Sequence, residues 1–207
     1  YAQEVINYPD IKYYITDKYD STNMLVSLFC AEESLAGNVI VSYADILFEI
    51  ELLDQMIASK DDIVVAVDTN WRHYWEMRYG VVDYDTESLQ LDKNNRITSL
   101  GKANPPIEEI DARYIGLVKL SDIGIGQLKK VWRKYRDEFW YKSWQVSGEP
   151  LRNAYITDML MALIDENYCV TALKTRNGWI EFDTDEDYEN ALKWYENEDL
   201  RSVMKID

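Results

Sequence analysis

Two short apolar runs, one that begins at Asn38 and one at 63–67, constrain the fold of this chain more than any other feature. Both are rich in β-branched residues, as buried strands are, and the residues between them, 49–59, have the apolar spacing of a helix. A strand, a helix and a second strand predict a βαβ unit with parallel strands and a right-handed crossover. The first run ends in Ser42-Tyr43-Ala44-Asp45 and the second ends at Asp68, so we expect both carboxylates at the same edge of a sheet.

Further strands and helices follow this unit and predict an α/β fold. The polar turn at 92–95 indicates an antiparallel hairpin, and Arg176-Asn177-Gly178 indicates a second hairpin between strands at 170–173 and 179–182. The last helix follows Thr184, which forms a capping-box pattern with Asp187. We expect one domain over 1–207, with a further strand at 114–120 and helices at 125–144 and 155–166.

Charge and composition exclude several classes of function. The 207 residues include 22 Lys and Arg against 38 Asp and Glu, a net charge of −16, which argues against binding nucleic acid or an anionic membrane surface. No apolar run approaches the roughly 20 residues of a membrane-spanning helix. The two cysteines form neither a disulfide framework nor a metal motif, so we expect a reducing, cytoplasmic location.

Asp45 is the first candidate for a functional side chain. In an open α/β sheet, ligands bind beyond the carboxyl ends of the strands, and a carboxylate there can hold Mg²⁺ together with substrate phosphates. An alternative is that Asp45 caps the helix that follows it.

A second candidate is the acidic strand end at 179–187. Glu181 and Asp183 alternate with apolar residues and therefore project from one face of the predicted strand. That face is either a cation site or a solvated edge, and the sequence leaves both open.

Two other clusters have structural as well as functional interpretations. Trp71, Tyr74, Trp75 and Tyr79 could form an aromatic box for an ammonium group, but such a cluster is more often core or interface packing. The basic residues at 129–136 interleave with aromatics in a predicted amphipathic helix, which favours packing over nucleic-acid binding.

Motifs spread over nearly the whole chain resemble one family, the nucleotidyltransferases that include choline-phosphate cytidylyltransferases and phosphonate-tailoring cytidylyltransferases. The most specific is Gly178-Trp179-Ile180-Glu181-Phe182-Asp183-Thr184. The others are Ser21-Thr22-Asn23 with Ser27-Leu28, Val41 to Phe48, Val65-Ala66-Val67-Asp68 with Trp71, Tyr114-Ile115-Gly116-Leu117, and Tyr155-Ile156-Thr157-Asp158.

The resemblance implies a three-layer, Rossmann-like (GT-A-like) mixed sheet in which Asp45 and Asp183 jointly hold Mg²⁺ on the phosphates of a nucleoside triphosphate, CTP above all. An oxygen of an amine-bearing phosphate or phosphonate, such as phosphocholine, would attack the α-phosphate and release pyrophosphate. The nucleotide would lie against Thr22, Asn23, Ser27, Tyr43 and Ala44. The acceptor would lie against Trp71, Tyr155, Asp158, Trp179 and Glu181.

The chain departs from this family in one respect. Members begin with a Gly-rich, Arg-containing loop that cradles the triphosphate and a later Lys-Pro segment, and this sequence has neither. We therefore expect an N-terminally incomplete domain, the C-terminal two-thirds of a usual member. A non-catalytic binding or assembly module and a GT-A glycosyltransferase are the alternative functions, and a homodimer is a further hypothesis.

Overall fold

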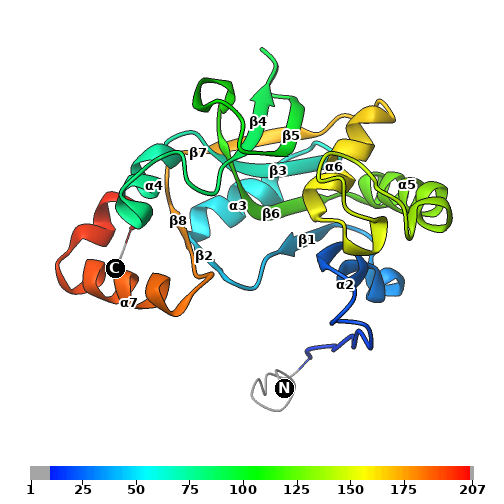
Figure 1. The fold of residues 1–207 in the computed structure, drawn as a ribbon, viewed down its shortest axis with the longest axis horizontal. Helices are drawn as coiled ribbons and strands as arrows, with labels where there is room; N and C mark the ends of the chain where they lie inside the picture. The colour runs from blue at the N-terminus through cyan, green and yellow to red at the C-terminus, as the bar shows by residue number, and fades with distance from the viewer. Residues whose placement is uncertain (1–9, 206–207) are drawn as a thin grey trace.

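A mixed four-stranded sheet lies at the centre of the protein (Figure 1). The structure, a computed structural model, describes residues 10–205. The strand order is β1 (Val39–Ser42), β6 (Arg113–Leu120), β3 (Ile63–Asp68) and β7 (Thr171–Thr175). Strand β6 runs antiparallel to both of its neighbours, whereas β3 and β7 are parallel. The sheet is therefore mixed, as the resemblance implied.

The two strands of the predicted βαβ unit run parallel, as expected, but they are not neighbours in the sheet. Strands β1 and β3 point the same way because both are antiparallel to β6, which lies between them. Helix α3 (Ile50–Ala58) makes the connection. The first predicted strand is β1, which ends at Ser42 just before Asp45. A separate strand that was not predicted, β2 (Ile46–Phe48), follows outside the central sheet and pairs antiparallel with β8 (Trp179–Glu181).

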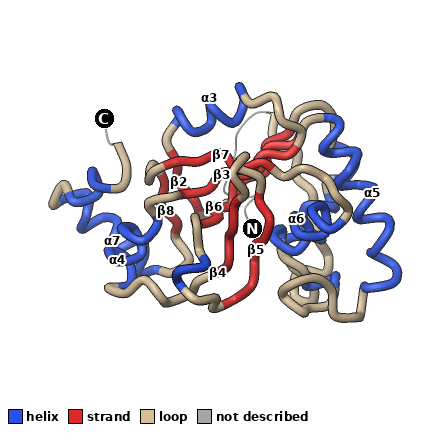
Figure 2. The backbone as a smooth tube through the Cα atoms, turned by 90° about the horizontal axis from the view of Figure 1, so that it is seen from above, coloured by secondary structure: helices blue, strands red, loops and turns tan. Residues whose placement is uncertain are grey.

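Helices cover both faces of the sheet, which gives the predicted three layers (Figures 1 and 2). Along β3, Val65 and Val67 pack into the core shared with one helical layer, and Val64 and Ala66 pack into the other. The first layer contains α2 (Met24–Cys30), α5 (Asp122–Phe139) and α6 (Ile156–Asp165). The second contains α3, α4 (Trp71–Tyr79) and α7 (Asp185–Glu196).

The hairpin predicted around 92–95 is present as β4 (Glu87–Leu91) and β5 (Ile97–Ala103). Short 3₁₀ turns complete the described chain at Glu32–Ser34, Ile107–Glu109, Leu151–Asn153 and Asp199–Ser202. Among the described helices, none has the length and apolar character needed to cross a membrane.

The second predicted hairpin is wrong, because β7 and β8 pair with β3 and β2 rather than with each other. The turn between them is held by Asp68, which is fully buried. Its Oδ1 accepts the backbone N–H of Asn177 at 3.0 Å, and its Oδ2 accepts the indole N–H of Trp179 at 3.0 Å. Asp68 is thus an anchor inside the protein and not a second carboxylate at a binding edge.

Candidate functional site

A cavity of about 290 Å³ opens where β1 ends and β2 begins. Strand β6, the start of the β4–β5 hairpin and the end of β8 form the rest of its lining, together with the first residues of α6. Carboxylates and tyrosines dominate this surface. The carboxylates are Asp45, Asp85, Glu87, Glu181 and Asp183, and the tyrosines are Tyr43, Tyr114 and Tyr155.

Tyr43 and Gly116 determine the path of the chain into the cavity. The backbone N–H of Tyr43 donates to the carbonyl of Gly116 at 2.9 Å, and the Tyr43 ring lies over the glycine. A Cβ on Gly116 would lie 2.7 Å from the Tyr43 ring, and the glycine has φ of +81°. Only glycine combines that conformation with so close a ring. The sequence interpretation of 114–120 as a strand is confirmed, with Gly116 as the residue that admits Tyr43.

Asp45 lies just beyond this contact, between β1 and β2. Its side chain is exposed, and no described residue donates a hydrogen bond to its carboxylate. The alternative that Asp45 caps the next helix is wrong, because Glu49 occupies the N-cap position of α3. Asp45 therefore has a carboxylate available to a ligand in the cavity.

The β2–β8 ladder brings Asp183 to the same cavity. Ile46 is paired with Glu181, and the N–H of Phe182 donates to the carbonyl of Asp45 at 2.8 Å. Because the strands are antiparallel, the residues just before β2 face those just after β8. The two aspartates, which the family resemblance had brought together, thus meet through a local antiparallel pair of strands.

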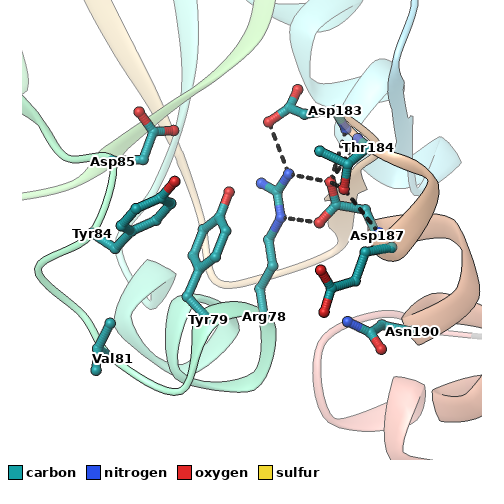
Figure 3. A pocket seen from close by; sticks show the side chains of 10 residues that line it. Arg78, Tyr79, Val81, Tyr84, Asp85, Asp183, Thr184, Asp187 and Asn190 are labelled. Carbon is teal, nitrogen blue, oxygen red and sulfur yellow. Dashed lines mark hydrogen bonds and ion pairs between the residues drawn. The ribbon is translucent and has the colours of Figure 1, made fainter.

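Arg78 of α4 binds the acidic residues on this side of the cavity (Figure 3). Its side chain is only 1% exposed and is ion-paired with Glu181, Asp183 and Asp187. The Nη2–Oδ2 distance to Asp183 is 2.8 Å, and Asp187 accepts from Nε at 2.6 Å and from Nη2 at 2.8 Å. A second cavity of about 520 Å³ adjoins this group and shares Asp85 and Asp183 with the first.

Burial and ion pairing shift the pKa values of the acids in this group in opposite directions. Burial raises the pKa of Glu181 to about 7, although Arg78 and Arg113 oppose the shift. Burial also acts on Asp187, but hydrogen bonds from Arg78 and Thr184 outweigh it and hold the pKa of Asp187 below its ordinary value. Burial raises the pKa of Glu87, which lies farther along the lining.

Sequence reasoning did not identify Arg78. The available signal was its position, because Trp71, Trp75 and Arg78 recur at helical spacing and are all buried. An arginine on the apolar face of a helix has to be paired with acids elsewhere in the chain. The ambiguity between aromatic core and aromatic box is resolved in favour of core for Trp71, Tyr74 and Trp75, each of which is at most 1% exposed.

Three residues expected around an acceptor lie elsewhere. Trp71 and Trp179 are fully buried among the aromatic core residues, so they offer no surface to a ligand. Asp158 is also fully buried, and it accepts the backbone N–H groups of Ser147 at 3.0 Å and Tyr155 at 2.9 Å. These are corrections of the sequence-based expectation. Tyr155 and Glu181, expected in the same group, do line the cavity with Asp45.

The residues expected at the nucleotide are divided between local structural contacts and the cavity. Asn23 caps α2, and its amide donates to the carbonyl of Asn153 at 3.2 Å. Thr22 and Ser27 bond to backbone carbonyls of their own segment, those of Lys18 and Asn23. None of the three lines the cavity, whereas their neighbour Met24 and Tyr43 do, and Ala44 is exposed between β1 and β2.

The free carboxylate oxygens of this cavity suit a cation that is bound partly by the protein and partly by a substrate. Within residues 10–205, no group of three or more His, Cys, Asp or Glu side chains forms a protein-only metal site. Asp45 and one oxygen of Asp183 remain without hydrogen bonds from described residues. Two carboxylates completed by phosphate oxygens and water are the usual protein environment of Mg²⁺ in phosphoryl-transfer sites.

Comparison with known proteins supports the resemblance stated above. No family model matches the chain. It is 30% identical over 195 residues to the CTP:phosphoglutamine cytidylyltransferase of Campylobacter jejuni, covering 91% of this chain and 75% of that protein.

Solved structures of low sequence identity share the fold. The inositol-1-phosphate CTP transferase of T. maritima matches with a TM-score of 0.58 and 21% identity, over 86% of this chain and 64% of that one. The CTP:phosphocholine cytidylyltransferase of Streptococcus pneumoniae matches with a TM-score of 0.55 and 16% identity, over 87% of this chain and 67% of that one. The chain thus spans just under two thirds of the first of these proteins. Given its relationship to the Campylobacter enzyme, this chain belongs to the cytidylyltransferase family of nucleotidyltransferases.

Proposed function

We propose that this protein joins a cytidylyl group from CTP to a small amine-bearing phosphate or phosphonate in a Mg²⁺-dependent reaction. The observation that carries the proposal is the meeting of Asp45 and Asp183 at one cavity, with a free carboxylate oxygen on each. In this reaction an oxygen of the acceptor phosphate forms a bond to the α-phosphorus of CTP. The bond from that phosphorus to the β-phosphate oxygen breaks, and pyrophosphate leaves.

In this proposal Asp45 and Asp183 hold the metal on the phosphates of the nucleotide. Bound Mg²⁺ supplies positive charge that stabilises the charge developing on the phosphate oxygens. The protein otherwise binds and orients the two substrates, with Tyr43 and Ala44 on the side of the nucleotide. Thr22, Asn23 and Ser27 lie in and next to α2. They are proposed to approach the base and ribose from there.

The acceptor is proposed to lie against Glu181 and Tyr155. Acidic and aromatic side chains suit an ammonium group through charge and cation–π attraction, which supports an amine-bearing acceptor such as phosphocholine. The name of the Campylobacter relative adds phosphoglutamine to the acceptors worth testing. Trp71, Asp158 and Trp179 are fully buried and are left out of this proposed pocket.

A pyrophosphate-release assay tests the proposal. The protein is incubated with CTP, MgCl₂ and one acceptor at a time, namely phosphocholine, 2-aminoethylphosphonate or phosphoglutamine, and products are identified by ³¹P NMR. We expect release with one acceptor class, none in EDTA, and loss in Asp45→Asn. Asp54→Asn is the matched control, because Asp54 is exposed on α3 and lines neither cavity.

The outcomes separate this function from its alternatives. Calorimetry that detects no Mg²⁺-dependent CTP binding, or equal binding in Asp45→Ala, would contradict the proposal. CTP binding without turnover of any acceptor would favour a non-catalytic module. Hydrolysis of a nucleotide sugar, without reaction of CTP and an acceptor, would select a glycosyltransferase.

A further inference from the structure

Arg78 is the one cation that contacts three of the acids around the two cavities at once within the described residues. It lies on the buried face of α4, with its guanidinium 4.7 Å from the Tyr79 ring centre and 5.8 Å from that of Trp75. A guanidinium presents its donors in a fixed plane, so contacts on one edge determine where the other donors point. The partners on one edge of Arg78 therefore determine which groups its other donors can reach.

Asp187 fixes the plane of the guanidinium. It accepts from Nε and Nη2 with separate oxygens, at 2.6 Å and 2.8 Å, which is the bidentate geometry that arginine and carboxylate favour. Asp187 is itself held by Thr184, whose N–H donates to Oδ2 at 2.9 Å and whose hydroxyl accepts the Asp187 N–H at 3.2 Å. The capping box at the start of α7 thus sets the orientation of Arg78.

The remaining donors of Arg78 reach the two acids of the first cavity. Nη1 contacts Glu181, and Nη2 donates to Oδ2 of Asp183 at 2.8 Å. The other oxygen of Asp183 is turned away from the guanidinium (Figure 3), and no described residue donates a hydrogen bond to it. Arg78 therefore holds one oxygen of Asp183 and leaves the second for a ligand.

We propose that Arg78 is a positioning residue for the metal site, which orients Asp183 and Glu181 from a plane fixed by Asp187 and does not itself touch substrate. This role rests on the proposed function, because it presumes that Asp183 binds the metal. Partners of this kind behind a metal ligand typically change metal affinity by about 10- to 100-fold when they are removed.

Mn²⁺ binding to the CTP-loaded protein tests the role, measured by calorimetry or electron paramagnetic resonance. Arg78→Lys keeps the charge but loses the planar, bidentate geometry, and we expect it to weaken Mn²⁺ binding about 10- to 100-fold. Arg72→Lys is the matched control. Arg72 lies on the same helix but bonds to the carbonyls of Ile107 and Ile110 away from both cavities, so we expect unchanged affinity.

A double-mutant cycle distinguishes positioning from general structural support. If Arg78 acts through Asp183, then Arg78→Lys has less than about a threefold further effect on Mn²⁺ binding once Asp183→Asn is present. Equal effects in both backgrounds would overturn the positioning role, as would wild-type or tighter Mn²⁺ binding in a folded Arg78→Lys protein. Absence of Mn²⁺ binding in the wild type would instead remove the proposed function, and this role with it.

Circular dichroism shows whether each variant is folded. Should Arg78→Lys fail to fold, Asp187→Asn takes its place, because it keeps the shape of the capping side chain and removes the charge that holds the guanidinium. We then expect weaker Mn²⁺ binding in Asp187→Asn. Wild-type affinity in that variant would overturn the positioning role.

Discussion

The two sides of the first cavity hold their aspartates in different ways. On the Tyr43 wall, formed by Tyr43, Asp45 and Gly116, the position of Asp45 follows from a backbone hydrogen bond and the packing of a ring on a glycine. The Arg78 wall consists of Glu181 and Asp183, which line this cavity, and of Arg78 and Asp187, which line the second one. There the position of Asp183 follows from a buried guanidinium shared among acids.

Because of this difference, the two walls should respond to different changes. Packing around Tyr43 involves neutral groups, so the Tyr43 wall should respond to changes of volume and backbone conformation. The Arg78 wall is held by charges that have been removed from water, so it should respond to loss of a partner and to pH. Four predictions test that contrast, in order of decreasing effect.

The largest effect is expected from Arg78→Gln. Removing one member of a buried ion pair typically costs about 3–5 kcal/mol, because the remaining charges are left without compensation. Here Glu181 and Asp187 have side chains only 15% and 8% exposed, so little water is available to replace the arginine. Urea denaturation measures the change in the free energy of unfolding.

Arg72→Gln is the control for that measurement. Arg72 donates hydrogen bonds to backbone carbonyls and lies over the Trp71 ring, but it pairs with no acid, so its loss should cost less than about 2 kcal/mol. Equal losses of unfolding free energy in Arg78→Gln and Arg72→Gln would show that the acids around Arg78 do not depend on this arginine.

The second effect is expected from Gly116→Ala on the Tyr43 wall. A side chain at φ of +81° is strained, and its Cβ would lie 2.7 Å from the Tyr43 ring. Left-handed conformation and overpacking together suggest a loss of about 2–4 kcal/mol in the free energy of unfolding, again from urea denaturation. Gly126→Ala is the control, since it lies in α5 with no atom near its Cβ, and it should stabilise the protein by up to about 1 kcal/mol.

The third effect, from Asp45→Asn, is expected in activity and not in stability. No described residue bonds to the Asp45 carboxylate, so the free energy of unfolding should change by less than about 0.5 kcal/mol. Loss of a metal ligand should lower kcat/KM by about 100-fold or more, equivalent to about 2.7 kcal/mol. Stability loss without loss of turnover would mean that Asp45 supports the fold and not the reaction.

Much of the fold is readable from the sequence where local pattern decides structure. The apolar run at 63–67, the 92–95 turn and the Thr184–Asp187 capping box each depend on neighbouring residues, and each is present in the structure. Strand partners depend on residues far apart in the chain. For this reason the insertion of β6 between β1 and β3, and the pairing of β8 with β2, were missed.

The candidate site shows the same limit. Asp45 and Asp183 were named together through family resemblance, but pattern alone could not supply the β2–β8 register that joins them. Trp179 and Asp158 belong to motifs that match the family. Both side chains are buried, however, and make structural contacts, Trp179 with Asp68 and Asp158 with Ser147. A motif identifies which residues matter, whereas exposure decides which of them can touch a ligand.

The smallest effect is expected from acid, which should remove the stability that Asp187 gives the Arg78 wall and leave the Tyr43 wall intact. Glu181 does not add to this loss, because burial raises its pKa to about 7 and its protonation therefore favours the folded state. The pKa of Asp187 in the folded protein lies below its ordinary value of 3.8, because Arg78 and Thr184 outweigh the opposing effect of burial. The unfolded chain therefore binds the proton more readily, and the stability that Asp187 contributes is present above pH 3.8 and lost as pH falls through the folded pKa. The neutral acid still accepts hydrogen bonds from Thr184, which keeps the loss small.

The measurement compares the free energy of unfolding of the wild type and of Asp187→Asn from neutral pH downward. We expect the wild type to be the more stable at neutral pH and the difference to shrink below pH 3.8. Gly116→Ala should instead differ from the wild type by the same amount throughout, because packing on Tyr43 involves no charge. The contrary result is a difference in the free energy of unfolding between the wild type and Asp187→Asn that stays constant while the pH falls. In that case the charge of Asp187 does not stabilise the Arg78 wall, and both walls depend on packing alone. The contrast between them is then lost.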